Sequence, residues 1–220
     1  MLVSSDDAAS LGAFSCPTNR LFASLIQEVY SLKKIGYCIT GSFCTFARSF
    51  LVLRSLIDIG YEVVPIMSEN AYYTDTRFAL AEEFSRKVED ACGRRIVHTI
   101  VDAEPLGPKE PLDALVVAPC TGNTLAKAAL GITDTAATMA IKAHLRQDRP
   151  TLIALATNDA MSANLANIGT MLKRRNVYFV PMKQDAPKGK PHSLVAEFEL
   201  IPDALLALLH GEQLRPLFLC

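Results

Sequence analysis

LDALVVAPCTGNTLAKAALG, residues 112–131, is the stretch of the chain that decides the predicted fold. Its first half is a short apolar run rich in branched residues, which predicts a strand buried on both faces. Its second half predicts a helix of small residues and places Gly131 where helices commonly end. Between them, Pro119 to Thr124 form a strand-to-helix turn with two hydroxyls, an amide and a glycine. In an open parallel sheet, ligands bind at such turns because backbone N–H groups point past the end of the strand.

Apolar runs of strand length recur along the chain and alternate with helical patterns. Gly60 and Gly93 follow two of these helical patterns, where a helix end is expected. This alternation predicts an α/β fold in three layers, a doubly wound parallel sheet with helices on both faces. The expected strands are residues 35–40, 61–67, 96–101, 112–118, 152–156 and 177–180, and the expected helices are 43–59, 75–92, 124–130, 133–146, 160–175 and 202–209.

The regular alternation starts at Lys34, so we expect residues 34–220 to form a single domain. Residues 1–33 form an N-terminal extension in this interpretation, with apolar residues at helical spacing from about residue 18. Residues 184–193 contain two prolines, a glycine and two lysines, which predicts a loop.

Composition limits the function classes. The chain has 220 residues, half of them apolar, which suits one large α/β domain. Its formal net charge is −1 and it has no basic run, so neither nucleic-acid binding nor a polybasic membrane role is supported. No apolar stretch approaches the ~20 residues that a membrane-spanning helix needs. We therefore expect a soluble protein.

The cysteines and histidines give no sign of a disulfide scaffold or a metal site. Six cysteines are present without CxxC spacing, which predicts free thiols in a reducing, cytoplasmic environment. The four histidines are scattered without metal-like spacing, so we expect no zinc site.

Polar residues follow four of the expected strands. If the strands are parallel, all four loops meet at one edge of the sheet. Gly41-Ser42, with Thr45 one helical turn later, suits a phosphate and is equally typical of an ordinary helix cap. Neither GxGxxG nor GxxxxGK[ST] is present, which argues against a dinucleotide fingerprint or a P-loop. The four loops are Gly41-Ser42, Ser68-Glu69-Asn70, Thr121 to Thr124, and Thr157-Asn158-Asp159.

Three segments in and around these loops resemble those of a known family. Gly41-Ser42, residues 118–127 (APCTGNTLAK) and residues 131–134 (GITD) together resemble the flavoprotein family that contains the cysteine decarboxylases and the flavin prenyltransferases. The hallmark is Ala-Pro, a short variable segment, then Asn-Thr opening a helix, with Gly and Asp beyond it. The likeness covers residues 34 to about 182. It implies a flavodoxin-like fold and an FMN pocket at a subunit interface of a homo-oligomer.

The resemblance also implies positions for the cofactor. Gly41, Ser42 and Thr45 would face the FMN phosphate, and Ser68 would come from the second loop. The opening stretch would face the phosphate, the ribityl chain or the ring edge, and the fourth loop would close the pocket. Asn123 and Asp159 also have a simpler interpretation as helix caps. The residues implied for these last two segments are Pro119, Thr121, Gly122, Asn123 and Thr124, and Asn158 and Asp159.

Further segments resemble one type of subunit within this family, among them residues 103–109 (AEPLGPK), 157–160 (TNDA) and 190–196 (KPHSLVA). They imply a subunit that works with an NADP-dependent partner subunit to oxidise dihydrodipicolinate to dipicolinate in sporulating bacteria. The NADP chemistry is expected mainly on the partner, because this chain offers no convincing base. Arg77 is a candidate for binding the dicarboxylate, since a guanidinium pairs well with carboxylates, and is otherwise a solvated charge.

The chain lacks a histidine that the decarboxylases of this family use. They use a histidine near the second and third strand ends, whereas residues 68–78 contain none. His98 is the nearest and is expected within a strand, in a structural role, so decarboxylation is disfavoured. Two alternatives stay open: a stand-alone FMN-dependent decarboxylase or prenyltransferase-like enzyme, and a non-catalytic scaffold for the partner subunit. No catalytic residue is assigned.

Overall fold

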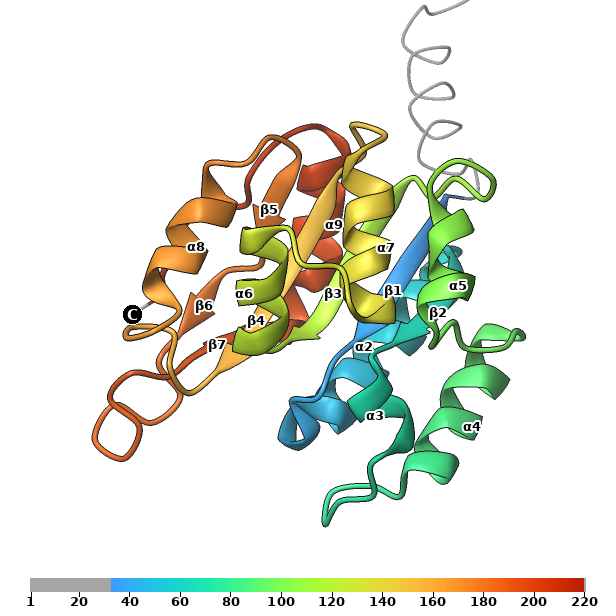
Figure 1. The fold of residues 1–220 in the computed structure, drawn as a ribbon. Coiled ribbons are helices and arrows are strands. Elements are labelled where there is room, and N and C mark those ends of the chain that lie inside the picture. The colour runs from blue at the N-terminus through green and yellow to red at the C-terminus, as the bar shows by residue number, and fades with distance from the viewer. Residues whose placement is uncertain (1–32, 220) are drawn as a thin grey trace, which may run out of the picture. The chain divides into compact units, whose positions relative to one another are not determined.

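An open central sheet runs through the part of the chain that this computed structural model describes, residues 33–219 (Figure 1). The extension expected over residues 1–33 lies outside the described residues except for Lys33. Five strands are parallel, in the order β2-β1-β3-β4-β5, which is the flavodoxin-type order. The strands are β1 (Lys34–Ile39), β2 (Glu62–Met67), β3 (Ala114–Cys120), β4 (Thr151–Thr157), β5 (Val177–Phe179), β6 (Met182–Lys183) and β7 (Leu194–Ala196).

The central strands are buried on both faces, as the apolar runs predict. All seven residues of β3 are buried, and β3 lies between β1 and β4. Gly36 in β1 is needed for this packing, because an added Cβ would lie 2.8 Å from the side chains of both Leu112 and Leu115. The strand of the opening stretch therefore lies in the middle of the core.

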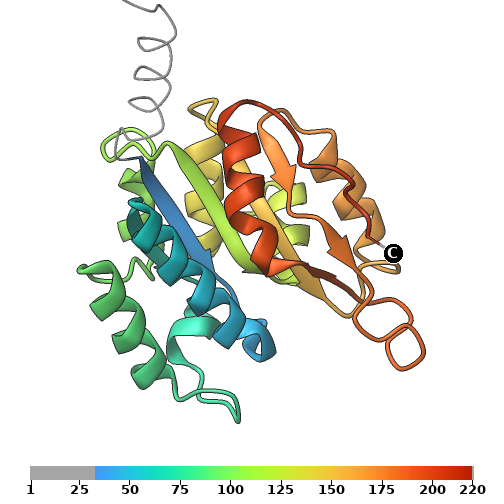
Figure 2. The same cartoon turned by 180° about the vertical axis from the view of Figure 1, so that it is seen from behind.

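Helices cover both faces of the sheet, so the three-layer prediction is confirmed. One face carries α5 (Ile100–Ala103), α6 (Gly122–Leu130), α7 (Ala136–Leu145) and α8 (Leu165–Leu172), in front in Figure 1. The other face carries α2 (Phe46–Ile59) and α9 (Ile201–Leu209), in front in Figure 2. Each face has its own buried apolar cluster. The remaining elements are α3 (Glu69–Tyr73), α4 (Ala81–Cys92), and the 3-10 helices η1 (Phe43–Thr45), η2 (Glu104–Leu106) and η3 (Phe198–Leu200).

The helix of the opening stretch begins and ends where local chemistry requires. Thr121 caps α6, its Oγ1 accepting a hydrogen bond from the Thr124 N–H at 3.2 Å. Gly131 ends the helix with a φ of 75°, a left-handed conformation that favours glycine. The cap is therefore Thr121, and the simpler interpretation of Asn123 as the capping residue is wrong.

The strand expected over residues 96–101 is not formed. Val97 makes one isolated parallel bridge to Ile66 at the end of β2. Thr99 then caps α5, because its hydroxyl accepts from the Asp102 N–H at 3.1 Å. A local helix cap thus replaces the rest of the strand.

Three other boundaries differ from expectation. Strand β3 runs to Cys120, so Pro119 and Cys120 lie in the strand and not in the turn. The helix expected from Asp75 begins only at Ala81, although the Asp75 carboxylate accepts the Ala81 N–H at 2.8 Å. The helix expected over residues 160–175 is shorter, because turns occupy the chain before α8.

The sheet is mostly but not entirely parallel. After the loop at residues 184–193, β7 pairs antiparallel with the carboxyl half of β4 and with β6. The amino half of β4 pairs with β5 instead. Such two- and three-residue strands are too short to give a periodic signal in the sequence. Among residues 33–219, no helix is both long and apolar enough to cross a membrane.

Candidate functional site

The loops after β1, β2, β3 and β4 lie at the same edge of the sheet, here called the carboxyl edge, because these four strands are parallel. Backbone hydrogen bonds connect neighbouring loops directly. The Ser68 N–H donates to Ile39 O at 3.0 Å, and the Thr40 N–H donates to Pro119 O at 3.1 Å. The structure therefore brings the first three predicted loops side by side.

Two buried hydroxyls that sequence reasoning missed fix the position of the β3 turn. The Thr40 hydroxyl donates to Pro119 O at 2.8 Å and accepts from the Thr121 N–H at 2.9 Å. Ser49, on α2, donates to Ala118 O at 2.7 Å. Both residues are fully buried. Ser49 could have been recognised in the sequence, because it interrupts the apolar face of α2 and a buried hydroxyl needs a hydrogen-bond partner.

The Gly41-Ser42 turn opens η1 and then α2. Its backbone is closed by Thr45, whose N–H and hydroxyl both donate to Ser42 O, at 3.0 and 2.8 Å. The half-exposed Ser42 hydroxyl has no hydrogen-bond partner among residues 33–219. The first N–H groups of a helix lack intrahelical acceptors, and no acidic residue lies in the first turn of η1 or α2. This turn offers unpaired donors, and its own helical turns carry no acidic residue.

The second loop is tied into the fold on both sides. Ser68 caps α3 by accepting from the Ala71 N–H at 3.3 Å. The Glu69 carboxylate accepts from the Ala136 N–H, the first residue of α7, at 3.1 Å. Ser68 is therefore placed at the shared edge with its hydroxyl already engaged.

His98 lies beside this second loop, and its expected place within a strand is wrong. It comes directly after the single Val97 bridge and stacks on Tyr72 of α3, with ring centroids 3.9 Å apart and an interplanar angle of 6°. Tyr73 meets the same ring edge-on at 5.7 Å. The sequence analysis named His98 in a structural role but did not predict this stacking, because it placed residues 96–101 in a regular strand.

The fourth loop forms a closed polar network behind α6. The Thr157 hydroxyl donates to Asp159 Oδ1 at 2.5 Å, and Asn164 Nδ2 donates to Asp159 Oδ2 at 2.9 Å. These three side chains surround Gly122, where an added Cβ would lie 2.5, 2.6 and 2.8 Å from Asn164 Nδ2, Thr157 Oγ1 and Asp159 Oδ1. The start of α6 thus already faces a carboxylate, which its dipole favours.

The other predicted site residues lie outside these networks. Asn123 and Asn158 are exposed, on α6 and on the fourth loop. Arg77 is exposed on the loop between α3 and α4, with its Cζ 4.8 Å from the centroid of the Phe78 ring. Its role in binding a dicarboxylate stays a prediction.

Two of the thiols near this edge are buried, whereas Cys44 in η1 is exposed. Burial raises the pKa of the Cys120 thiol to about 12, so it is protonated at neutral pH. Burial also raises the pKa of Cys38. Within the described part of the chain, no group of three or more His, Cys, Asp or Glu side chains is placed to hold a metal ion.

These features define a class: an open α/β protein whose candidate ligand site, at the carboxyl edge of a parallel sheet, is built from helix starts and hydroxyl groups. The chain belongs to the Flavoprotein family, whose sequence model matches residues 26–201.

Relatives within this family are close over most of the chain. The B subunit of dipicolinate synthase from Bacillus subtilis (strain 168) is 41% identical over 185 residues, which cover 84% of this chain and 92% of that protein. The crystal structure of the corresponding B subunit from Bacillus halodurans has a TM-score of 0.79 and 38% identity, covering 86% of this chain and 96% of that one. The FMN-dependent cysteine decarboxylase SpaF shares the fold, with a TM-score of 0.62, 24% identity and coverage of 81% and 97%. The flavodoxin-like fold is thereby confirmed.

Proposed function

We propose that this chain binds FMN at the carboxyl edge and acts as the B subunit of a dipicolinate synthase. The observation that carries the cofactor assignment is the pair of helix starts held together by Thr40, one at the Gly41-Ser42 turn and one at Thr121. Support for the role comes from the 41% identity to the B subunit of the Bacillus subtilis synthase. Solved proteins of the same fold are FMN-dependent.

The two helix starts suit different parts of FMN. A phosphate needs N–H donors, which the Gly41-Ser42 turn offers without an acidic residue in the first turn of η1 or α2. The start of α6 already faces the Asp159 carboxylate, so it suits the uncharged ribityl hydroxyls or the ring edge. In this proposal Gly41, Ser42 and the turn closed by Thr45 hold the phosphate. The remaining contacts would come from Ser68, Pro119, Thr121, Gly122, Asn123, Thr124 and Asn158.

FMN, when bound, supplies two-electron redox chemistry, and this chain's residues would position it. The substrate in this proposal is dihydrodipicolinate, and an A subunit would carry NADP. Arg77 would hold a substrate carboxylate by paired hydrogen bonds. We propose further that the chain forms a homo-oligomer and works in the cytoplasm.

The experiment is reconstitution. The full chain is purified alone and together with the A subunit, and both flavin in the denatured supernatant and dipicolinate formation are measured. We expect flavin in the purified chain and dipicolinate only from the pair. Full synthase activity from the A subunit alone would contradict the role of this chain.

A matched pair of variants tests the cofactor assignment separately. Ser42→Ala removes a hydroxyl expected on the phosphate, and a hydrogen bond to a charged group is worth about 1.5–3 kcal/mol, so FMN should bind at least about tenfold more weakly. Ser55→Ala, on α2 after that turn, removes a hydroxyl that donates to Val52 O and should leave the affinity unchanged. Fluorescence titration with FMN measures both. Equal affinities of the two variants would refute the phosphate position.

His98 favours a second candidate, a stand-alone FMN-dependent decarboxylase. Its ring lies at the carboxyl edge, where it stacks on Tyr72 and is half-buried. Within the expected strand the ring would not have been exposed at this edge. Release of CO2 from a carboxylated substrate without the A subunit, abolished by His98→Gln, would favour this candidate. A colourless protein whose Ser42→Ala variant retains full synthase activity would favour the third candidate, a scaffold for the A subunit.

A further inference from the structure

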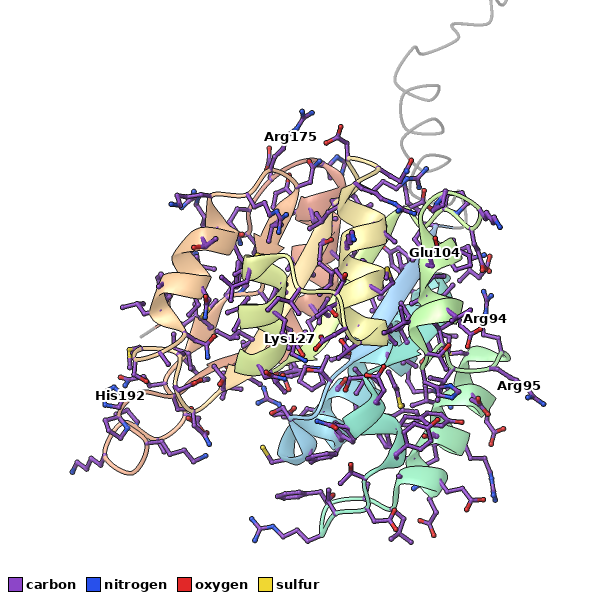
Figure 3. All side chains as sticks on the ribbon, viewed as in Figure 1. Arg94, Arg95, Glu104, Lys127, Arg175 and His192 are labelled. Carbon is purple, nitrogen blue, oxygen red and sulfur yellow. The ribbon has the colours of Figure 1, made fainter. Side chains whose placement is uncertain are left out.

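A second cavity lies on the helical face formed by α6, α7 and α8, away from the carboxyl edge. It has a volume of about 320 Å3 and lies between the end of α6, the outer side of α7 and the residues after α8. Arg175, on its rim, comes two residues before β5, whose first residue pairs with the first residue of β4. In Figure 3, Arg175 lies at the opposite end of the molecule from His192, which is on the loop at the carboxyl edge. Strand β4 has seven residues, so its two ends are roughly 20 Å apart.

The charge lining this cavity is entirely positive. Lys142, Arg146, Arg174 and Arg175 line it, and no aspartate or glutamate does. None of these four side chains forms an ion pair within residues 33–219, whereas seven other basic side chains of the described chain do. In a chain with a net charge of −1, this is a local concentration of unneutralised positive charge.

The cationic groups come from two sides and are partly held in place. Arg174 Nη1 donates to Ala128 O, near the end of α6, at 3.1 Å, which leaves the other guanidinium N–H groups for a ligand. Lys142 and Arg146 are four residues apart and therefore lie on the same side of α7. A ligand between these two pairs would meet positive charge on both sides.

The floor of the cavity is apolar. Ile132, Ile141 and Leu145 line it together with Ala128. Ile132 is 42% exposed although it lies within this cavity, so a ligand would remove apolar surface from water there. A small hydrated inorganic ion makes no use of such a floor. An aromatic or aliphatic body with charged substituents uses both the floor and the rim.

We propose that this cavity binds a small organic anion with at least two negative charges, phosphate or carboxylate, on an apolar body. The site is separate from the flavin site and does not depend on the proposed function.

Calorimetric titration of the full chain at 150 mM salt tests the proposal. The probes are ADP and benzene-1,3-dicarboxylate, which separate the phosphate from the carboxylate source, with inorganic phosphate as a probe without an apolar body. We expect one organic probe to bind at least about tenfold more tightly than inorganic phosphate.

Two double variants with the same change of net charge locate the binding. Lys142→Gln with Arg146→Gln should weaken the organic probe at least about tenfold, because charge-assisted hydrogen bonds are lost. Arg54→Gln with Arg95→Gln removes two exposed cations outside the cavity and should have no effect. FMN affinity should be the same in both.

Three results would overturn the proposal. The first is that neither organic probe shows saturable binding. The second is that the two double variants weaken binding equally. The third is that FMN displaces the probe while Lys142→Gln with Arg146→Gln leaves the affinity for the probe unchanged. The last result would place the probe at the carboxyl edge instead.

Discussion

The two ends of β4 differ in how their polar groups are satisfied. At the carboxyl end, Thr157, Asp159 and Asn164 are hydrogen-bonded to one another and support the start of α6. At the amino end, the Thr151 hydroxyl and His144 Nδ1 are buried without a partner among the described residues. At the carboxyl end, Ser193 Oγ in the loop before β7 is also buried without a partner among these residues, but the side chains around Asp159 form a closed network on which a ligand site can be built. The amino end instead keeps a buried imidazole that resists gaining charge.

Gly122→Ala should cause the largest loss of stability, because it breaks the network at the carboxyl end. The new Cβ would lie 2.5 to 2.8 Å from polar atoms of Asn164, Thr157 and Asp159. These side chains cannot move apart without breaking the hydrogen bonds that Thr157 and Asn164 donate to Asp159. Overpacking plus two disrupted hydrogen bonds predicts a loss of about 4 kcal/mol in the free energy of unfolding. Urea denaturation measures it.

Gly169→Ala is the matched control. Gly169 lies in α8, and an added Cβ there meets nothing within 4 Å. The same substitution should be neutral or stabilise by up to about 1 kcal/mol, since alanine favours helix. A loss of less than about 1 kcal/mol in Gly122→Ala would show that the network yields and does not hold α6 rigidly.

His144 at the amino end should produce the next largest effect, through pH. Its Nε2 lies 2.9 Å from Pro150 O, which can only accept, so Nε2 carries the proton and Nδ1 is bare. Burial lowers the pKa of His144 to about 4, further helped by Arg149, while the Pro150 bond opposes the shift.

The sign follows from proton uptake. Between pH 6.5 and about 4 the unfolded chain binds a proton at this position and the folded protein does not, so stability falls as the pH falls. The shift corresponds to about 3 kcal/mol lost across that window. His144→Gln lacks this loss, and urea titrations of both proteins at pH 7 and pH 4 measure the difference. Parallel pH profiles would contradict a neutral buried imidazole.

Asp159→Ala tests the same carboxyl-end network from its acceptor side, with a smaller expected effect. The substitution leaves the Thr157 hydroxyl and the buried Asn164 amide without their partner. We expect a loss of about 2 kcal/mol, measured by thermal or urea unfolding. Asn158→Ala, on the exposed neighbour, should change stability by less than about 0.5 kcal/mol. Similar losses in both variants would mean that the loop as a whole matters and not the network.

Local signals in the sequence could be predicted, whereas contacts between distant residues could not. Residues 112–131 predicted a strand, a turn and a helix because branched apolar residues and a terminal glycine are local signals, but β3 includes Pro119 and Cys120, which were expected in the turn, and the cap is Thr121 and not Asn123. The gathering of four loops followed from the parallel order alone. Thr40 and Ser49 were missed because their partners lie 79 and 69 residues away, and hydrogen bonds across such separations leave no local pattern.

The cationic cavity and the stacked position of His98 were missed for related physical reasons. The cavity is assembled from the end of one helix, the side of another and the residues after a third, so its charges are not consecutive in the sequence. His98 sits in an apolar segment whose pattern favours a strand, and the Thr99 cap overrides that preference. The antiparallel β7 is only three residues long and depends on pairing with β4.

Ser42→Ala should have the smallest effect on stability and thereby separates binding groups from supporting groups within the carboxyl edge. The Ser42 hydroxyl has no partner in the described chain, and its carbonyl, which the substitution keeps, closes the turn with Thr45. We therefore expect a change of less than about 0.5 kcal/mol in the free energy of unfolding without FMN. At the same excess concentration of FMN, the variant should gain less stability than the wild type, because the stabilisation by a ligand grows with the logarithm of its concentration divided by its Kd. A large loss without FMN would mean that Ser42 supports the fold, as Thr157 does. The Gly41-Ser42 turn would then belong to the supporting structure, like the network around Asp159, and would not offer free binding groups.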